Sequence, residues 1–413
     1  MSNTVFRSAD LLIPEEDLLP RWAVIACDQY TSEPEYWEAV RQAVGDAPSA
    51  LNLIFPEAWL KEDREARVAF INRSMEDALR RAIFRTYPDS FVYVERTLVS
   101  GAVRRGIVGA VDLDAYDYRP DAHSAIRATE RTVVSRIPPR VAIRRDAPLE
   151  LSHALMLCDD ETETLVERLT DEKPGLPKLY DFDLMQGGGR VAGWLVSGGA
   201  RARLEERIRA YEQRMAEKYA ALGVTPILYA VGDGNHSLAT AKECWETLRR
   251  ERPAMAEGHP ARYAMVELEN IRDAAQAFEP IHRVVTGVKP AELLDAARAI
   301  CAPEGHPVPF VTSDGAGTLL LNRDLGDLPV AILQRFLDGI ADADQVDYIH
   351  GDDTAARLGS RPDSVAFLLP AIPKDGLFPG IARDGALPRK TFSMGHACEK
   401  RYYLEARRIR LPD

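Results

Sequence analysis

The sequence predicts an α+β protein, and three observations support this fold class. First, segments with helical periodicity occur beside short runs of β-branched and aromatic residues. Second, two of the β-branched and aromatic runs flank a glycine-containing turn. Third, the predicted strands and helices do not alternate regularly. Regular alternation would favour a parallel α/β sheet, whereas separate hairpins, single strands and helices are typical of α+β folds. We therefore expect a mixed sheet with helices packed against it.

The N-terminal half contains the clearest local signals. A helix is predicted from Glu62 to Ile83, because apolar residues recur there every three or four positions and form one buried face. A hairpin is predicted next, with residues 91–98 and 107–113 as its strands. The glycine-rich stretch from Gln186 to Trp194 lacks the terminal G-K-[ST] of a P-loop, so we interpret it as a turn.

The rest of the chain mixes helices with single strands. A helix is predicted from Arg201 to Leu222, and another begins near Pro290. Further elements are predicted as strands at Thr318–Asn322 and Val365–Pro370 and a helix at about Pro329–Ile340.

Composition excludes several classes of protein. The net charge of −12 and the absence of a helix-turn-helix signature argue against a nucleic-acid partner. No window approaches the roughly 18 apolar residues of a membrane span, and the first ten residues lack an apolar signal region, so we expect a cytoplasmic protein. The five cysteines form no C-x-x-C pair, so neither a zinc site nor a disulfide framework is expected. A single cysteine could be a nucleophile, but a buried small apolar residue is the favoured interpretation.

The stretch V-G-D-G-N-H-S-L-A-T-A-K, residues 231–242, concentrates polar chemistry at the junction of a predicted strand (227–231) and a predicted helix. Free backbone N–H groups at a helix N-terminus attract anions, and Gly234 allows a positive φ or a close approach of a ligand. Asp233 is a candidate for holding a metal or taking a proton, and His236 for donating to a phosphate oxygen. The alternative is an ordinary Asn or Ser helix cap with Asp233 in an Asx-turn.

This stretch resembles the D-G-H-H-R-Y-E-T-A element of the bacterial and archaeal family called domain of unknown function 1015. The resemblance covers almost the whole chain, and further matching segments are R-G-I-V-G-A-V-D-L (105–113), A-T-E-R-T (128–132), I-H-R-V-V (281–285), I-L-Q-R-F-L-D-G-I (332–340) and L-P-R-K-T-F (387–392). Two positions depart from the commoner motif: Asn235 replaces its first His, and Ser237 replaces its Arg. Loss of the Arg removes a bidentate clamp for a phosphate, so the ligand can differ from that of other members.

The motif is also similar to that of the ParB/sulfiredoxin-like superfamily, which includes nucleotide-hydrolysing partition proteins, sulfiredoxins and free-serine kinases. The resemblance implies a ParB/sulfiredoxin-like mixed core with additional helices and strands. Residues 1–413 would form one family-wide unit, with a core at 20–285 that carries the D-G-N-H loop. An α+β segment at 286–413 would contribute Arg389 and Lys390 to the site.

Phosphoryl transfer needs positive charge around the transferred group and a positioned acceptor hydroxyl. The resemblance implies that Asp233 and His236 lie at the reacting phosphate, with Asp233 the candidate metal ligand. Candidate phosphate-binding residues are Gly234, Asn235, Ser237, Lys242, Arg283, Arg389 and Lys390. For Arg389 and Lys390 the alternative is a solvated surface pair.

Three further candidates have structural alternatives. Glu130 is a candidate base for the acceptor hydroxyl, but a helix-surface glutamate bridging to Arg127 or Arg131 would look the same in sequence. His282, next to Arg283, is a candidate substrate or metal residue, and the two could equally form a structural pair. Asp28 follows the predicted strand W-A-V-I-A and could face the pocket.

The leading hypothesis is a Mg²⁺-dependent phosphotransferase. The donor would be ATP, ADP or inorganic pyrophosphate, and the acceptor a small hydroxylated metabolite, with free L-serine favoured by the similarity to free-serine kinases. Two alternatives stay open: a ParB-like nucleotide-binding switch without a small-molecule acceptor, and a phosphatase that uses the same Asp and His.

Overall fold

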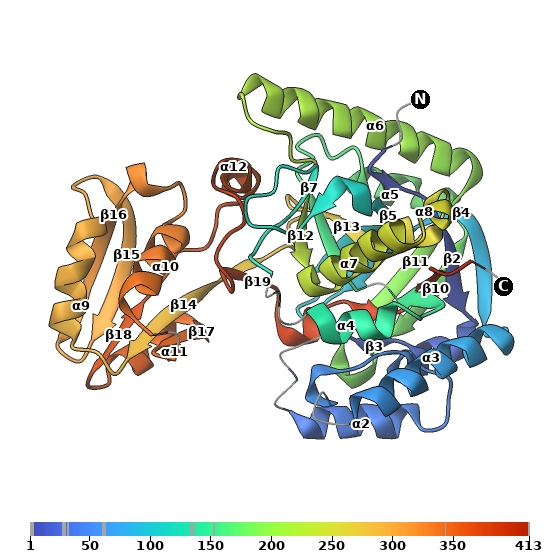
Figure 1. Ribbon diagram of the computed structural model, residues 1–413, viewed down its shortest axis with the longest axis horizontal. Helices are drawn as coiled ribbons and strands as arrows, with labels where there is room; N and C mark the ends of the chain where they lie inside the picture. The colour runs from blue at the N-terminus through green and yellow to red at the C-terminus, as the bar shows by residue number, and fades with distance from the viewer. Residues whose placement is uncertain are drawn as a thin grey trace.

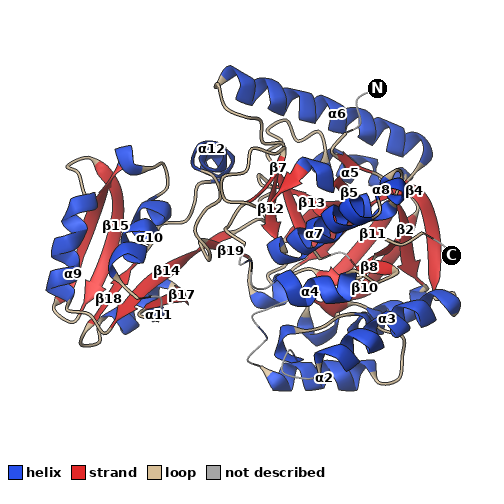
Figure 2. Cartoon of the chain, in the orientation of Figure 1, coloured by secondary structure: helices blue, strands red, loops and turns tan. Residues whose placement is uncertain are grey.

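The structure is a computed structural model that describes residues 4–26, 30, 33–59, 63–132, 134, 137–151, 153–342 and 344–411. It combines twelve helices and several sheets within these residues, so the predicted α+β class is confirmed (Figures 1 and 2). The candidate Asp28 lies outside the described residues.

A thirteen-stranded sheet, counted over the described residues, forms the larger body, which contains the strands nearest to both chain ends (Figure 1). The order of its strands along the main path is β6-β7-β12-β9-β13-β5-β4-β2-β21-β8. Outside this path, β1 pairs with β5, and β11 pairs with both β10 and β4. Its strands are β1 (Phe6–Arg7), β2 (Ala9–Pro14), β4 (Phe84–Thr97), β5 (Val103–Asp112), β6 (Tyr116–Asp117), β7 (Ile126–Ala128), β8 (Leu149–Leu151), β9 (Leu155–Cys158), β10 (Lys178–Asp183), β11 (Arg190–Val196), β12 (Tyr229–Asp233), β13 (Tyr263–Asn270) and β21 (Ala406–Arg408).

Most neighbouring strands in this sheet are antiparallel, while β7 is parallel to both β6 and β12, and β13 is parallel to β9. The predicted hairpin is β4 and β5, in which Val92 lies opposite Val108. The glycine-rich stretch is a turn only in its first part, because β11 already begins at Arg190. The prediction of a turn throughout was wrong, since Val191 to Val196 pair with β4 and supply side chains to the core.

Helices cover the sheet of the larger body (Figure 2). The predicted helix at residues 62–83 is α3 (Arg64–Arg80), whose buried face includes Ile71 and Met75. The other helices of this body are α1 (Leu19–Trp22), α2 (Pro34–Val44), α4 (Ile137–Arg144), α5 (Val166–Glu172), α6 (Gly198–Ala221), α7 (Asn235–Glu251) and α8 (Pro253–Ala256). Among the helices of the described residues, none has the length and apolar character needed to cross a lipid bilayer.

A second, six-stranded sheet in the described residues forms the smaller body, on the left of Figure 1. Its order is β16-β15-β18-β14-β17, with β19 paired to the start of β14. Its elements are β14 (Phe278–Thr286), α9 (Pro290–Ala297), β15 (Gly305–Thr312), β16 (Gly315–Asn322), α10 (Pro329–Ile340), β17 (Val346–His350), α11 (Asp352–Gly359), β18 (Ser364–Phe367) and β19 (Phe392–Met394).

The chain returns to the larger body after this second sheet. Helix α12 (Lys374–Asp384) lies between the two bodies, β20 (Tyr402–Tyr403) pairs with β3 (Val24–Ile25), and β21 joins the large sheet (Figure 1). The boundary expected between residues 285 and 286 falls at the end of β14, and residues 286–413 contribute to both bodies. The last segment of the chain is therefore available to complete a site in the larger body.

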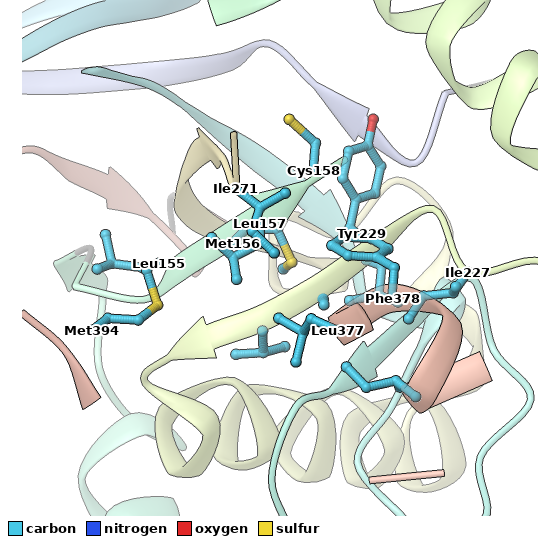
Figure 3. Close-up of a cluster of buried hydrophobic side chains, with 14 of the residues drawn as sticks. Leu155, Met156, Leu157, Cys158, Ile227, Tyr229, Ile271, Leu377, Phe378 and Met394 are labelled. Atoms are coloured by element: carbon cyan, nitrogen blue, oxygen red, sulfur yellow. The ribbon is translucent and has the colours of Figure 1, made fainter. Parts of the chain in front are cut away.

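Figure 3 shows the part of the core on which the site rests. Leu155, Met156 and Leu157 of β9 pack with Tyr229 of β12, and Phe378 of α12 belongs to the same buried cluster. Cys158 is fully buried there, which agrees with its expected role as a small apolar residue. The same cluster includes Leu238 and Trp245 of α7, so the helix that begins at the D-G-N-H loop is fixed to the core.

We expect Phe378→Ala to lower the free energy of unfolding by about 3–5 kcal/mol, because the substitution leaves a cavity in a fully buried cluster. Urea unfolding at neutral pH measures this change. Phe70→Ala is the matched control, since Phe70 is 38% exposed, and its effect should stay within about 0.5 kcal/mol. Equal losses in the two variants would contradict the placement of α12 in the core.

Candidate functional site

The D-G-N-H stretch forms the expected strand-to-helix junction. Asp233 ends β12, Gly234 is the N-cap of α7, and Asn235 is the first helical residue. Gly234 has φ +83°, and a Cβ at this position would lie 2.8 Å from Cα of Ala154. Both the backbone angle and the close packing therefore require glycine. The first N–H groups of a helix lack partners within the helix and can bind an anion.

This junction lines a cavity of about 300 Å³. The lining residues come from several separate stretches of the chain: Ile25, Ala26, Trp37, Ile54, Phe55, Pro56, Glu130, Arg131, Arg140, His153, Asp233, Gly234, Asn235, His236, Ser237, Arg389, Lys390, Lys400 and Tyr403. Five of these residues are arginine or lysine and two are carboxylates. One wall is apolar and aromatic. The cavity is therefore suited to a ligand that has an anionic group and an apolar part, with the apolar part packed against this wall.

Asp233 is paired inside this cavity. One carboxylate oxygen accepts a hydrogen bond from the Gly234 N–H at 2.7 Å, and the other lies 3.0 Å from Nζ of Lys400. Burial raises the pKa of Asp233, but the charge and hydrogen bond of Lys400 and the Gly234 N–H outweigh it, so the pKa lies below its ordinary value. Asp233 is thus ionised at neutral pH.

Glu130 contacts the L-P-R-K-T-F segment rather than Arg127 or Arg131. Its carboxylate accepts hydrogen bonds from the backbone N–H groups of Lys390 and Thr391, both at 2.9 Å, and of Phe392 at 3.4 Å. Burial raises the pKa of Glu130 against the lowering effect of these three N–H groups. Both oxygens are engaged, so the geometry favours a role in positioning this loop over the expected role as a base.

Arg283 holds the same loop from the other side. Its buried guanidinium donates to the carbonyls of Lys390 at 3.1 Å and Arg389 at 3.4 Å, and to Gln334 at 2.6 Å. Burial lowers its pKa to about 10. Arg283 is not among the residues that line the cavity, although the sequence made it a candidate to bind phosphate. It holds the loop in place instead. Arg389 and Lys390 do line the cavity, and Arg389 also contacts the Tyr348 hydroxyl at 3.3 Å.

Two other candidates lie away from the cavity. Lys242 donates to the carbonyl of Leu113 at 2.8 Å and pairs with Glu246 at 2.9 Å, because six residues after His236 it lies on another face of α7. His282 is buried in the smaller body, where its Nδ1 accepts from the Leu369 N–H and its Nε2 lies 2.8 Å from Asp352. Neither residue can reach a ligand in the cavity.

The structure adds residues that sequence patterns did not reveal. His153, Arg140, Lys400 and Tyr403 all line the cavity, and none had been assigned a role. Nε2 of His153 lies 2.8 Å from Oγ of Ser237, although 84 residues separate the two in sequence. Arg131 belongs to the A-T-E-R-T match, which was the one sequence signal near this set. No spacing rule connects the others, because they meet only through the fold.

The remaining loop residues face the cavity as expected. Asn235, His236 and Ser237 form the first turn of α7 and line the cavity. Oδ1 of Asn235 is buried and has no hydrogen-bond partner among the described residues. A buried acceptor without a partner is costly, so a ligand hydroxyl or a bound water is expected to donate to it.

The described side chains do not fit a metal site built by the protein alone. No group of three or more His, Cys, Asp or Glu residues within the described part of the chain could hold a metal ion. Asp233, the expected ligand, already uses its two oxygens for Lys400 and Gly234. The described residues of this cavity therefore do not fit a Mg²⁺ held by the protein.

We expect Gly234→Ala to lower the free energy of unfolding by about 1–3 kcal/mol, because alanine at φ +83° is strained and its Cβ meets Ala154. Urea unfolding tests this expectation. Gly339→Ala is the control, since no atom lies within 4 Å of its Cβ position and α10 continues through it. A helix interior favours alanine over glycine, so the control should be neutral or slightly stabilising.

The lowered pKa of His153 should make the free energy of unfolding depend on pH. Burial lowers its pKa to about 4, Arg140 and Arg401 add to this effect, and Asp233 opposes it. The unfolded histidine has a pKa near 6.5, so the stability that the neutral ring contributes is complete above pH 6.5 and is lost as the pH falls towards 4. Between about pH 7 and pH 5 this loss amounts to about 2 kcal/mol.

The test compares urea unfolding at the two pH values. His153→Gln should lose less stability on acidification than the unchanged protein, because its side chain does not titrate. His123→Gln, at an exposed position, should retain the original pH dependence. Identical pH dependence in all three proteins would show that His153 is not buried as described.

Several solved structures are distantly similar to this chain. They include a free serine kinase mutant in complex with ADP, at 9% identity and a TM-score of 0.38, covering 72% of this chain and 91% of that one. SbnI with a C-terminal truncation from Staphylococcus aureus has 12% identity and a TM-score of 0.35, covering 70% and 82%. A conserved hypothetical protein from Pyrococcus furiosus has 10% identity and a TM-score of 0.33, covering 72% and 90%.

These similarities are too distant to transfer an activity. No curated protein matches the sequence. The family model described as "Protein of unknown function (DUF1015)" matches residues 8–341, which is most of the chain. The protein belongs to the domain of unknown function 1015 family.

Proposed function

We propose that this protein is a phosphotransferase that moves a phosphoryl group from ATP, ADP or inorganic pyrophosphate to the hydroxyl of a small metabolite. One observation carries the proposal: Arg131, Arg140, Arg389, Lys390 and Lys400 converge on the cavity at the N-terminus of α7. Phosphoryl transfer depends chiefly on positioning and on positive charge around the transferred group, and this cavity offers both.

The cations differ in how they are held, which suggests a division of roles. Lys400 is 9% exposed and fixed against Asp233, whereas Arg389 and Lys390 are exposed side chains on a loop whose backbone is held by Glu130 and Arg283. The fixed charge would set the position of the phosphoryl group. The two exposed side chains would contact the donor as it enters.

The acceptor would bind beside Asp233. An ionised carboxylate at the end of a strand can accept a hydrogen bond from a hydroxyl and orient it for attack. Free L-serine is the first acceptor to test, because the loop motif resembles that of the superfamily that includes free-serine kinases. Trp37, Ile54 and Phe55 would exclude water from the other side of the cavity.

Phosphorus NMR tests this function directly. Full-length protein is incubated with L-serine and with ATP, ADP or pyrophosphate in separate samples, each with and without Mg²⁺. We expect a new phosphomonoester signal in one donor series, and Asp233→Asn should lower its rate of appearance about 10²-fold or more.

A matched pair of lysine variants tests the placement of the site. Lys390→Gln should weaken donor binding, whereas Lys242→Gln should leave transfer unchanged, because Lys242 points away from the cavity. Inorganic phosphate formed equally with and without L-serine would instead indicate a phosphatase. Saturable nucleotide binding without any product would indicate a regulatory switch, and absence of both binding and turnover would reject the proposal.

A further inference from the structure

Ser237 and His153 form a close pair at the edge of the cavity. Ser237 is the third residue of α7, and its Oγ lies 2.8 Å from Nε2 of His153, which precedes β9. Both residues line the 300 Å³ cavity, and both also line an adjacent cavity of about 170 Å³ with apolar residues such as Leu53, Met75 and Leu149. The serine hydroxyl therefore lies at the wall between the two spaces.

The surroundings of His153 orient its ring. The ring is hydrogen-bonded to the backbone of Leu151 and lies beside the ring of Tyr403, with 4.8 Å between the ring centroids. A hydrogen bond to a backbone carbonyl is made by the Nδ1–H, which leaves the lone pair of Nε2 to accept the proton of Ser237 Oγ. A hydroxyl, a base within hydrogen-bond reach and a third group that orients the base are the general signature of an activated nucleophile.

We propose that Ser237 receives the phosphoryl group as a covalent phosphoserine, with His153 as the base that takes its proton. This inference rests on the proposed phosphotransferase function and makes it a two-step reaction.

The first step exchanges one bond to phosphorus for another. Oγ of Ser237 attacks the terminal phosphorus of the donor, the Oγ–P bond forms, and the bond between that phosphorus and its bridging oxygen breaks. The bridging oxygen leaves with the electron pair on the departing nucleotide or phosphate. The hydroxyl proton moves to Nε2 of His153.

The second step reverses these roles. The acceptor hydroxyl attacks the phosphoserine phosphorus, the Oγ–P bond breaks, and Oγ recovers its proton from His153 while the acceptor proton passes to solvent. Arg140 and the N-terminal turn of α7 line the same cavity and would stabilise the phosphoryl charge in both steps. The negative charge of the bound group would also raise the proton affinity of His153, whose pKa burial lowers to about 4.

Acid-quenched labelling tests for the intermediate. The full-length protein is incubated with ATP, ADP or pyrophosphate labelled in its terminal phosphoryl group, without acceptor, quenched in acid and mapped by mass spectrometry. A phosphoserine ester survives acid, whereas a phosphohistidine does not. We expect acid-stable label on Ser237 that disappears, with formation of labelled product, when L-serine is added.

A second probe does not depend on the natural donor. A fluorophosphonate reacts with activated serine hydroxyls by forming the Oγ–P bond and releasing fluoride. We expect it to modify Ser237, and His153→Gln to slow the modification about 10²–10⁴-fold. The exposed Ser360 is the control position, so Ser360→Ala should react as the unchanged protein does.

The outcomes separate this inference from the proposed function. Phosphoryl transfer with an unchanged kcat in Ser237→Ala, or label that does not pass to the acceptor, would overturn the covalent step and leave the phosphotransferase function intact. Ser237 modified by the fluorophosphonate, but with no phosphoryl transfer from any donor, would support the activated serine and reject the function. Failure of both probes would overturn the inference. In His153→Gln, kcat should fall while KM for the donor stays the same, which a structural role alone would not produce.

Discussion

The pairing of the buried Lys400 amine with the Asp233 carboxylate is the interaction on which the site depends. A lysine that is 9% exposed needs a partner for its charge, and the 3.0 Å contact with Asp233 supplies it. Lys400 belongs to the last segment of the chain and Asp233 to the strand that leads into α7. Their contact holds the C-terminal return of the chain against the D-G-N-H loop, and both segments line the cavity.

The other charged residues near the cavity have two different functions: some hold the backbone of a loop in place, and others face the cavity. Glu130 accepts hydrogen bonds from backbone N–H groups of the 389–392 loop, and Arg283 donates to a backbone carbonyl of the same loop. Because the backbone is held by Glu130 and by the buried Arg283, the side chains of Arg389 and Lys390 are left to face the cavity. Removing either support would leave buried polar groups of the loop without partners, which is costly. The two residues that hold the backbone of this loop thus determine where its cationic side chains lie.

A layer of buried ion pairs includes Arg401, the residue next to Lys400. Arg104 pairs with Glu269 at 2.9 Å, Arg401 contacts Glu267 and Glu405, and the fully buried Tyr180 donates to Glu405 at 2.5 Å. Buried charges that satisfy one another tolerate little movement, because displacement of one partner leaves the other unpaired in a low dielectric. This layer gives the segment around Lys400 a fixed position, which preorganises the charge that a phosphoryl group would meet.

Local patterns in the sequence determined the α+β class, the α3 helix, the β4–β5 hairpin and the position of the D-G-N-H loop at a helix start. They also gave a positive φ as one of two explanations for Gly234, because backbone angles, hydrophobic periodicity and helix caps depend on neighbours a few residues apart. Only the tertiary structure decided which charges converge. The contacts of Lys400 with Asp233, Glu130 with Lys390 and His153 with Ser237 join residues from 84 to 260 positions apart, a separation that no spacing rule encodes. Long-range contacts also hold Lys242, His282 and Arg283 outside the cavity. Their partners are the Leu113 carbonyl, the Leu369 N–H and the Gln334 side chain, respectively.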